Sequence, residues 1–213
     1  MAVMQHEIKT SLNVSAGPSV EPVTLAEAKS HMRVTHTDED ELITAWITAG
    51  RAECEKRCNR TFINQVYQLT MDRFPTCEII LPRPPIVSAS TVTYIDTDGA
   101  SQTISSGNYI LDATSEPGRI TPIPTYSWPS TQDRMTAVTV TYTAGYGASV
   151  SSWKTSGTNK YLGAYYLVRS AICLMVEHFR RNRGESEARI DSGSATDLAV
   201  DGLLSSLMLP EFH

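Results

Sequence analysis

The sequence has no excess of positive charge and few charged residues of either sign. Among its 213 residues, 18 Lys and Arg stand against 23 Asp and Glu, so the formal net charge is −5, and charged residues make up only 19% of the chain. Such a chain repels phosphate backbones instead of collecting them, which disfavours a protein that reads DNA sequence. A charged fraction below the roughly 25% of average soluble proteins favours a component of an assembly over a freely circulating monomer.

Long apolar runs are also missing. No segment approaches the roughly 18 consecutive apolar residues that cross a bilayer, and residues 1–18 lack the basic-then-apolar layout of a secretion signal. We therefore expect a soluble protein that is made in a cytoplasm. The hydrophobic fraction of 41% is enough for a core, and the length favours one large domain or a compact domain with appendages.

Cysteines are few, and only Cys54 and Cys58 stand close together. Four residues apart on a predicted helix, they share a face that can present two ligands to zinc, but neither Cys77 nor Cys173 belongs to a second pair with matching spacing. A disulfide between Cys54 and Cys58 is disfavoured because their Cα–Cβ bonds point in parallel directions one helical turn apart. We predict reduced, buried thiols and neither a metal nor a cofactor.

Catalytic motifs are absent from the sequence. There is no Gly-x-Ser-x-Gly elbow, and the histidines are scattered over the chain rather than grouped with candidate acids or nucleophiles: His6, His31, His36, His178 and His213. The sequence therefore predicts no catalytic residues and no enzyme.

Apolar spacing predicts an α+β fold, in which a helical frame carries an inserted antiparallel β domain. Spacings of three and four residues predict helices at 25–33, 38–59 and 159–183, and a period of two predicts strands from residue 61 onward. Capping boxes at Thr24–Glu27 and Thr37–Asp40 mark the first two helix starts. The predicted parts are an N-terminal arm at 1–21, the frame at 22–60 and 159–184, the β domain at 61–147, a Gly/Ser linker at 148–158, and a tether with a C-terminal tail at 185–213.

The C-terminal tail is the first candidate interaction site. A polar, Ser-rich stretch at 185–196 precedes a segment with renewed helical spacing of apolar residues. This segment either folds back on its own core or docks into a groove of a neighbouring molecule, and the polar tether favours docking. The candidate docking residues are Leu198, Leu203, Leu204, Leu207 and Leu209.

A basic cluster at the end of the last predicted frame helix is the second candidate site. Arg180, Arg181 and Arg183 either complement the negative end of the helix dipole or contact a phosphate or a carboxylate of a partner. Both interpretations are compatible with the sequence.

Seven short motifs follow one another in an order that resembles a known family. Together they are similar to the head-tail connector proteins of tailed bacteriophages, also called adaptor or head-completion proteins, from about residue 21 to 147 and more loosely through 159–184. The motifs are Glu21-Pro-Val-Thr-Leu-Ala-Glu-Ala-Lys, Asp38-Glu-Asp-Glu-Leu-Ile, Cys58-Asn-Arg-Thr-Phe-Ile-Asn-Gln, Leu81-Pro-Arg-Pro-Pro-Ile, Val92-Thr-Tyr-Ile-Asp-Thr-Asp-Gly, Pro117-Gly-Arg-Ile and Val138-Thr-Val-Thr-Tyr-Thr-Ala-Gly-Tyr-Gly.

This resemblance implies a virion structural protein, made in the bacterial host cytoplasm and located in the neck between capsid and tail. Such proteins form a ring, usually a dodecamer, that binds the portal protein, extends the DNA channel and offers a platform to the tail or a further neck protein. DNA passes through without sequence-specific binding, and no membrane is involved. The family's Leu-Leu-containing portal contact corresponds to Gly202-Leu203-Leu204-Ser205-Ser206-Leu207. The alternative interpretation of the sequence is a small β-rich module that binds a ligand or peptide.

Overall fold

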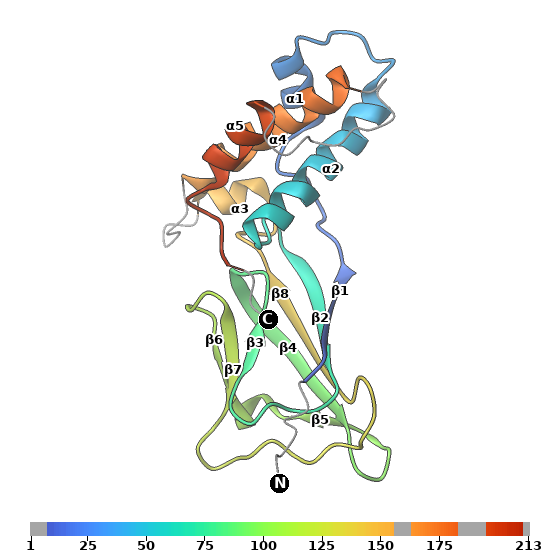
Figure 1. Cartoon of the computed structure of the whole chain (residues 1–213), viewed down its shortest axis with the longest axis vertical. Helices are drawn as coiled ribbons and strands as arrows, with labels where there is room; N and C mark the ends of the chain where they lie inside the picture. The colour runs from blue at the N-terminus through green and yellow to red at the C-terminus, as the bar shows by residue number, and fades with distance from the viewer. Residues whose placement is uncertain (1–7, 156–162, 183–194, 211–213) are drawn as a thin grey trace. The chain divides into compact units, whose positions relative to one another are not determined.

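The structure is a computed structural model that describes residues 8–155, 163–182 and 195–210 (Figure 1). Within these residues the chain divides into two compact units, each built from separate stretches of sequence. We call them the β unit, which contains residues 8–17 and 64–145, and the helical unit, which contains the remaining described residues. The α+β class predicted from the sequence is confirmed.

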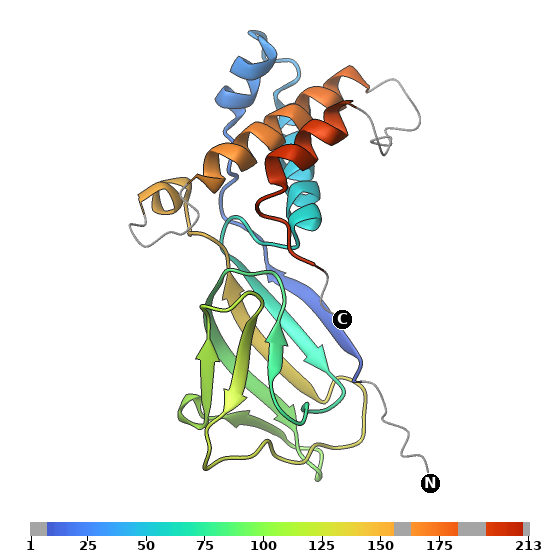
Figure 2. The same cartoon turned by 60° about the vertical axis from the view of Figure 1, so that its left-hand side comes forward.

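The β unit consists of two antiparallel sheets, seen as two layers in Figure 2. The larger has the strand order β1-β2-β8-β4-β5 and the smaller has the order β3-β7-β6. The strands are β1 (Thr10–Ala16), β2 (Gln65–Met71), β3 (Ile79–Leu81), β4 (Ile86–Ile95), β5 (Ser101–Ile104), β6 (Tyr109–Asp112), β7 (Gly118–Pro122) and β8 (Val138–Ala144), with a short 3-10 helix, η1 (Ser106–Asn108), before β6.

The core of the β unit lies between the two sheets. Buried and more exposed residues alternate along β2 and β8, because successive side chains point to opposite faces of a sheet. Tyr67 and Tyr142 stack across this pair of strands with ring centroids 5.6 Å apart, and the Tyr142 hydroxyl donates to the Pro82 carbonyl at 2.8 Å. Ile79, Leu81 and Ile120 from the smaller sheet complete the same hydrophobic cluster.

The N-terminal segment differs from the arm that the sequence predicted. Residues Thr10–Ala16 form β1, which pairs antiparallel with β2 from Thr10 opposite Met71 to Ala16 opposite Val66. Only Leu12 within the strand is partly buried, so β1 is held mainly by backbone hydrogen bonds at the edge of the sheet. A strand that buries so little shows no apolar alternation, which explains why the sequence did not indicate it.

The helical unit contains α1 (Leu25–Met32), α2 (Asp40–Cys58), α3 (Val150–Thr155), α4 (Ala164–Arg181) and α5 (Ala195–Leu204). The capping box predicted at Thr24 is confirmed, because Thr24 Oγ1 accepts from the Glu27 N–H at 3.2 Å and Glu27 Oε2 accepts from the Thr24 N–H at 2.9 Å. The second predicted capping box is wrong. Glu39 is the residue before the first turn of α2, and no side chain makes a capping hydrogen bond at this helix start.

Helices α2 and α4 pack closely where α2 carries a glycine. A Cβ atom on Gly50 would lie 3.3 Å from Met175 Cβ, closer than ordinary van der Waals contact, and 3.6 Å from Ile172 Cγ2, so the absence of a side chain lets the two helices approach closely. Ile47, Val168, Ile172 and Met175 are buried in the resulting core, whereas Trp46 is only partly buried.

The predicted Gly/Ser linker contains a helix. Residues Val150–Thr155 form α3, and Trp153 is fully buried against Tyr146, with ring centroids 4.8 Å apart, and against Phe62 at 6.0 Å. Ser149 Oγ accepts from the Ser152 N–H at 3.1 Å at the start of this helix. One buried tryptophan fixes a segment whose composition indicated a linker. Residues 156–158 of that linker and 159–162 of the predicted helix lie outside the described residues.

An ion pair network joins the beginning of the helical unit to the middle of α2. Arg51 Nε lies 2.7 Å from Glu21 Oε2, and Arg51 Nη1 lies 2.6 Å from Glu55 Oε2. Glu55 Oε1 also accepts from the Phe62 N–H at 2.8 Å, so one buried carboxylate holds both the helix and the chain that follows it.

Among the helices that the structure describes, none has the length and apolar character of a bilayer-crossing segment.

The α2–α4 core predicts the effect of two substitutions on one helix. Ile172→Ala should lower the free energy of unfolding by about 2 to 5 kcal/mol, because it leaves a cavity beside Gly50. Tyr166→Ala removes a side chain that is 61% exposed and should change it by less than about 0.5 kcal/mol. Urea unfolding of the full chain measures both, and equal values for the two variants would contradict the packing.

The capping box predicts a pH-dependent contribution to stability. Burial acts to raise the pKa of Glu27, but hydrogen bonds from Thr24 and the charge of Arg169 outweigh it, so this pKa lies below its ordinary value. Ionised Glu27 therefore stabilises the folded state at pH values above its unfolded-state pKa. This stabilisation is lost as the pH falls through the lowered folded-state pKa. Glu27→Gln should cost about 0.5 to 1 kcal/mol at pH 7, and the difference should disappear in acid. Unfolding measured from pH 7 to pH 2.5 tests this, and a difference between wild type and Glu27→Gln that persists at pH 2.5 would contradict it.

Candidate interaction surfaces

The C-terminal segment packs onto the helical unit in the described structure. One side of α5 and of the chain after it is buried in the core that α2 and α4 form, through Val200, Leu204 and Leu207. The segment is amphipathic, as the sequence indicated, but its buried side includes Val200 and only two of the five candidate leucines.

Arg57, in the last turn of α2, connects the C-terminal helix to α2. Its guanidinium lies 3.0 Å from Glu53 Oε1, 2.5 Å from Asp197 Oδ1 and 2.7 Å from Asp201 Oδ1. Burial acts to lower the pKa of Arg57, but hydrogen bonds to Asp201, Asp197 and Glu53 raise it above its ordinary value. The Arg57 guanidinium is therefore permanently charged, and it pairs with three carboxylates, one from α2 and two from α5.

The chain beyond α5 returns to the end of α2. Arg60 Nε donates to the Leu207 carbonyl at 2.6 Å, Asn59 Nδ2 donates to the Pro210 carbonyl at 3.1 Å, and the Leu209 N–H donates to the Cys58 carbonyl at 3.1 Å. These bonds satisfy polar groups at the end of α2 and in the chain after α5. One of them is the Cys58 carbonyl, which has no partner within its own helix because it lies in the last turn.

The five candidate docking leucines therefore have different environments. Leu204 and Leu207 are buried in the subunit's own core, while Leu203 and Leu209 are partly buried. Leu198 is 65% exposed and is the one candidate whose side chain projects mainly into solvent. The sequence left open whether this segment folds back on its own core or docks on a neighbouring molecule, and it favoured docking. An amphipathic pattern shows that a face is covered and does not show by which chain.

The basic cluster is paired with acidic residues within the same unit. Arg180 Nε lies 3.3 Å from Glu39 Oε2, and Arg181 pairs with Glu177 one turn earlier on α4. Arg183 lies outside the described residues. A contact of this cluster with a phosphate or a partner remains a prediction, and Arg181, whose side chain is 75% exposed, is its most accessible described member.

Three of the four cysteines are buried free thiols, and Cys77 is exposed. Burial raises the pKa of Cys54 well above its usual range and that of Cys58 to about 12. The thiolate form that zinc requires is thus disfavoured at both positions. The described residues contain no group of three or more His, Cys, Asp or Glu side chains placed to hold a metal ion.

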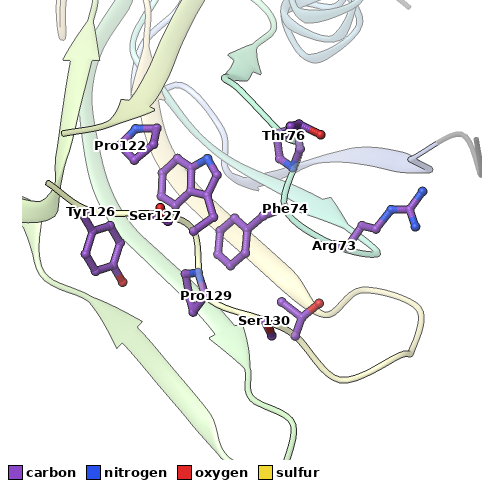
Figure 3. Close-up of a pocket in the computed structure, with 11 residues that line it drawn as sticks. Arg73, Phe74, Thr76, Pro122, Tyr126, Ser127, Pro129 and Ser130 are labelled. Carbon is purple, nitrogen blue, oxygen red and sulfur yellow. The ribbon is translucent and has the colours of Figure 1, made fainter. Parts of the chain in front are cut away.

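A pocket of about 440 Å³ lies in the β unit where the loops after β2 and after β7 meet (Figure 3). Phe74 from the first loop stacks on Trp128 from the second, with centroids 4.9 Å apart and planes 4° from parallel. The Trp128 indole donates to the Cys77 carbonyl at 3.4 Å, and Tyr94 of β4 packs edge-on against Phe74 at 5.7 Å. The residues that line the pocket are Arg73, Phe74, Pro75, Thr76, Pro122, Tyr126, Ser127, Trp128, Pro129, Ser130 and Thr131.

Sequence reasoning did not find this pocket. Its two aromatic segments are separated by about fifty positions and have no regular spacing, and each contains prolines that indicate only turns. The Trp128-Pro129 pair was visible as a break between strands, but nothing in the sequence placed it against Phe74.

Comparisons with known proteins find one matching family and several solved structures with a similar fold. The model of the family described as "Head completion protein" matches residues 21–200. A chain from the "Neck of empty GTA particle computed with C6 symmetry" superposes with a TM-score of 0.70 at 18% identity, covering 95% of this chain and 97% of that one. A chain from the "Neck of native GTA particle computed with C12 symmetry" gives 0.69 at 17% identity with the same coverage. A search of curated proteins finds no significant match.

The packing of α5 predicts opposite results for two leucines of one helix. Leu204→Ala should destabilise the protein by about 2 to 5 kcal/mol, since Leu204 is fully buried, whereas Leu198→Ala should be neutral within about 0.5 kcal/mol. Guanidinium unfolding followed by circular dichroism gives both values. A neutral Leu204→Ala would show that the segment is not part of the subunit's core in solution.

Proposed function

The chain belongs to the head completion protein family, and from this membership we propose that it is a structural subunit of the neck of a phage-like particle. In this proposal copies of the chain form a ring that binds the portal, prolongs the DNA channel and provides the platform for the tail or a further neck protein. The family match over residues 21–200 is the observation that carries the proposal, because it spans both units.

The particles from which the similar structures come support a place in a neck ring. Two of them are necks of GTA particles, computed with sixfold and twelvefold symmetry. A closed ring of one chain repeats a single heterologous interface, in which two different patches of the subunit meet. The low charged fraction of 19% agrees with a subunit whose surface is largely covered by neighbours.

The charge of the chain supports a conduit that does not retain DNA. Each phosphate that a protein neutralises adds affinity and salt dependence to the complex. The net charge of −5 and the pairing of the two described C-terminal arginines of α4 with Glu39 and Glu177 both act against retention of a passing duplex. A wall of this kind favours transit over binding.

We place the portal contact on the C-terminal segment, through the side that faces away from the core. Leu198 at 65% exposure and Met208 at 38% exposure are the apolar side chains on that side. Docking by Leu204 and Leu207 themselves would require the segment to leave its contacts with Arg57 and Arg60. A contact through the outward side therefore leaves the subunit's own core intact.

A small ligand-binding module is the second candidate function. The pocket lined by Phe74, Tyr126 and Trp128 favours it, because stacked aromatic rings beside hydroxyl groups are a frequent feature of peptide and ligand sites. Catalysis has no part in either proposal.

Assembly state distinguishes these functions. We expect the full chain to form rings, alone or on addition of portal rings, and to co-sediment with the portal; mass measurement and electron microscopy detect both. Leu198→Glu should weaken portal co-sedimentation at least tenfold without changing the unfolding midpoint, and Leu42→Glu, at an exposed leucine of α2, serves as the matched control. A chain that stays monomeric with and without portal, and whose melting temperature rises with a peptide or sugar, would support the ligand-binding module instead.

A further inference from the structure

Two cavities of the β unit adjoin at the loops that follow β2 and β7. The aromatic pocket of Figure 3 has a volume of about 440 Å³, and a second cavity of about 890 Å³ lies between the start of β1, the end of β2 and the loop before β8. Both volumes are typical of ligand sites. Arg73 and Thr131 line both cavities, so a ligand that is longer than the aromatic pocket can continue into the second cavity.

The loop between β7 and β8, which carries Trp128, is held in place although it contains no helix or strand. Ordered loops of this length without secondary structure are usually functional. The Ile123 N–H donates to the Asn108 carbonyl, just before β6, at 3.1 Å. The Gln132 N–H donates to the Ile95 carbonyl of β4, also at 3.1 Å. Because these two bonds fix the loop on either side of Trp128, the pocket is formed without a ligand and binding has little ordering cost.

The lining of the aromatic pocket combines flat rings with hydroxyl groups. Phe74, Tyr126 and Trp128 are each partly buried, and Ser127 and Ser130 are exposed beside them. The exposed surface of the lining is more polar than apolar. A purely apolar ligand would remove water from these hydroxyl groups without replacing its hydrogen bonds, which is unfavourable.

A pyranose sugar ring matches this combination of groups. Its C–H bonds form an apolar face that packs on an aromatic ring, and its hydroxyl groups donate and accept hydrogen bonds around the edge. Serine and threonine hydroxyls also take both roles. A proline-rich peptide packs on aromatic rings as well, but proline has no N–H and offers acceptors only. The net charge of −5 disfavours a nucleic-acid strand, whose bases also stack on such rings.

The second cavity offers groups that suit further sugar units. Lys9 and Arg134 are exposed donors in its lining, and Asp133 is an exposed acceptor. Met135 also lines this cavity and is 79% exposed, so it adds an apolar surface to the polar groups. Donors, acceptors and an apolar surface are thus present in the second cavity as they are in the first.

We propose that the two cavities form one binding site for an oligosaccharide. One pyranose ring packs on the aromatic rings around Trp128, and the units that follow pass Arg73 and Thr131 into the second cavity. The inference goes beyond the proposed neck function and does not depend on it, because every residue of the site belongs to the β unit of a single chain.

Binding of named hexasaccharides to the full chain tests the aromatic pocket. Cellohexaose, chitohexaose, maltohexaose and an alginate hexamer are the probes, and saturation-transfer NMR detects binding to single subunits and to rings alike. We expect at least one of them to bind at millimolar concentration. Trp128→Ala should weaken this binding about tenfold, because the stacking surface is lost. Tyr166→Ala, which removes an aromatic ring of α4 that is 61% exposed, is the matched control and should leave binding unchanged.

A second variant keeps the test valid if Trp128→Ala fails to fold. Ser130 is exposed, so Ser130→Ala should leave the unfolding midpoint unchanged and weaken binding about threefold through the loss of one hydrogen bond. Thr97→Ala, at the exposed turn between β4 and β5, removes a hydroxyl group outside the site and should have no effect.

The length of the saccharide tests the second cavity. The affinity should rise about tenfold from the two-unit to the six-unit member of the series that binds, because the longer chain makes additional hydrogen bonds. Arg134→Ala should reduce this gain and leave the affinity for the disaccharide unchanged, since Arg134 lines only the second cavity. Lys56→Ala, at an exposed cation of α2, should leave both affinities as in the wild type.

Three results would overturn the inference. They are the absence of binding by every one of these hexasaccharides, equal binding by wild type and by both site variants, and binding of decaproline where no saccharide binds, which would assign the pocket to a peptide. Equal affinities for two and six units would remove the second cavity from the site and contradict the proposal as stated. Ring formation is scored separately on the same proteins: a wild-type chain that binds a saccharide but forms no rings would count against the neck function alone.

Discussion

The close approach of α2 and α4 at Gly50 is the constraint on which the helical unit depends. These two helices are separated in sequence by residues 64–145, yet a Cβ atom on Gly50 would lie only 3.3 Å from Met175 Cβ. A larger side chain at this position would push the helices apart and loosen the core that also holds α3 and α5. The charged contacts of Arg51 and Arg57 run along the same helix, so α2 organises both the entry of the chain and its C-terminal end.

Much of the fold was predictable because burial leaves a periodic signal in sequence. The helices at Leu25–Met32 and Asp40–Cys58 appear close to their expected positions, and strands follow residue 61 as expected, beginning with β2 at Gln65. β1 was missed because an edge strand held by its backbone needs no apolar period, and α3 was missed because a single tryptophan determines it. Apolar periodicity in a sequence indicates which side chains are buried. It does not indicate elements that are stabilised by backbone hydrogen bonds or by a single buried residue.

The candidate sites were less predictable than the fold, for a different physical reason. The C-terminal segment is amphipathic as the sequence indicated, but only Leu204 and Leu207 of the five candidate leucines are buried, and sequence does not tell whether a face is covered by its own chain or by another. The position of Leu204 in the core depends on Arg57, Asp197 and Asp201, whose partnership joins residues far apart in sequence. The aromatic pocket depends likewise on two loops that meet only when the sheets have formed.

The way in which the chain leaves and re-enters the helical unit around residues 64–145 has a consequence for how such proteins diversify. Ile63 forms a bridge to Gly147, and the Tyr146 N–H donates to the Phe62 carbonyl at 3.0 Å, so departure and return occur side by side. For the helical unit, the segment 64–145 is therefore a closed loop, and the entropy of closing a loop rises only slowly with its length. Insertions and deletions can change the length of this segment while the helices keep their core. Head completion proteins with one kind of helical unit and inserted β segments of different lengths are the outcome that this geometry permits.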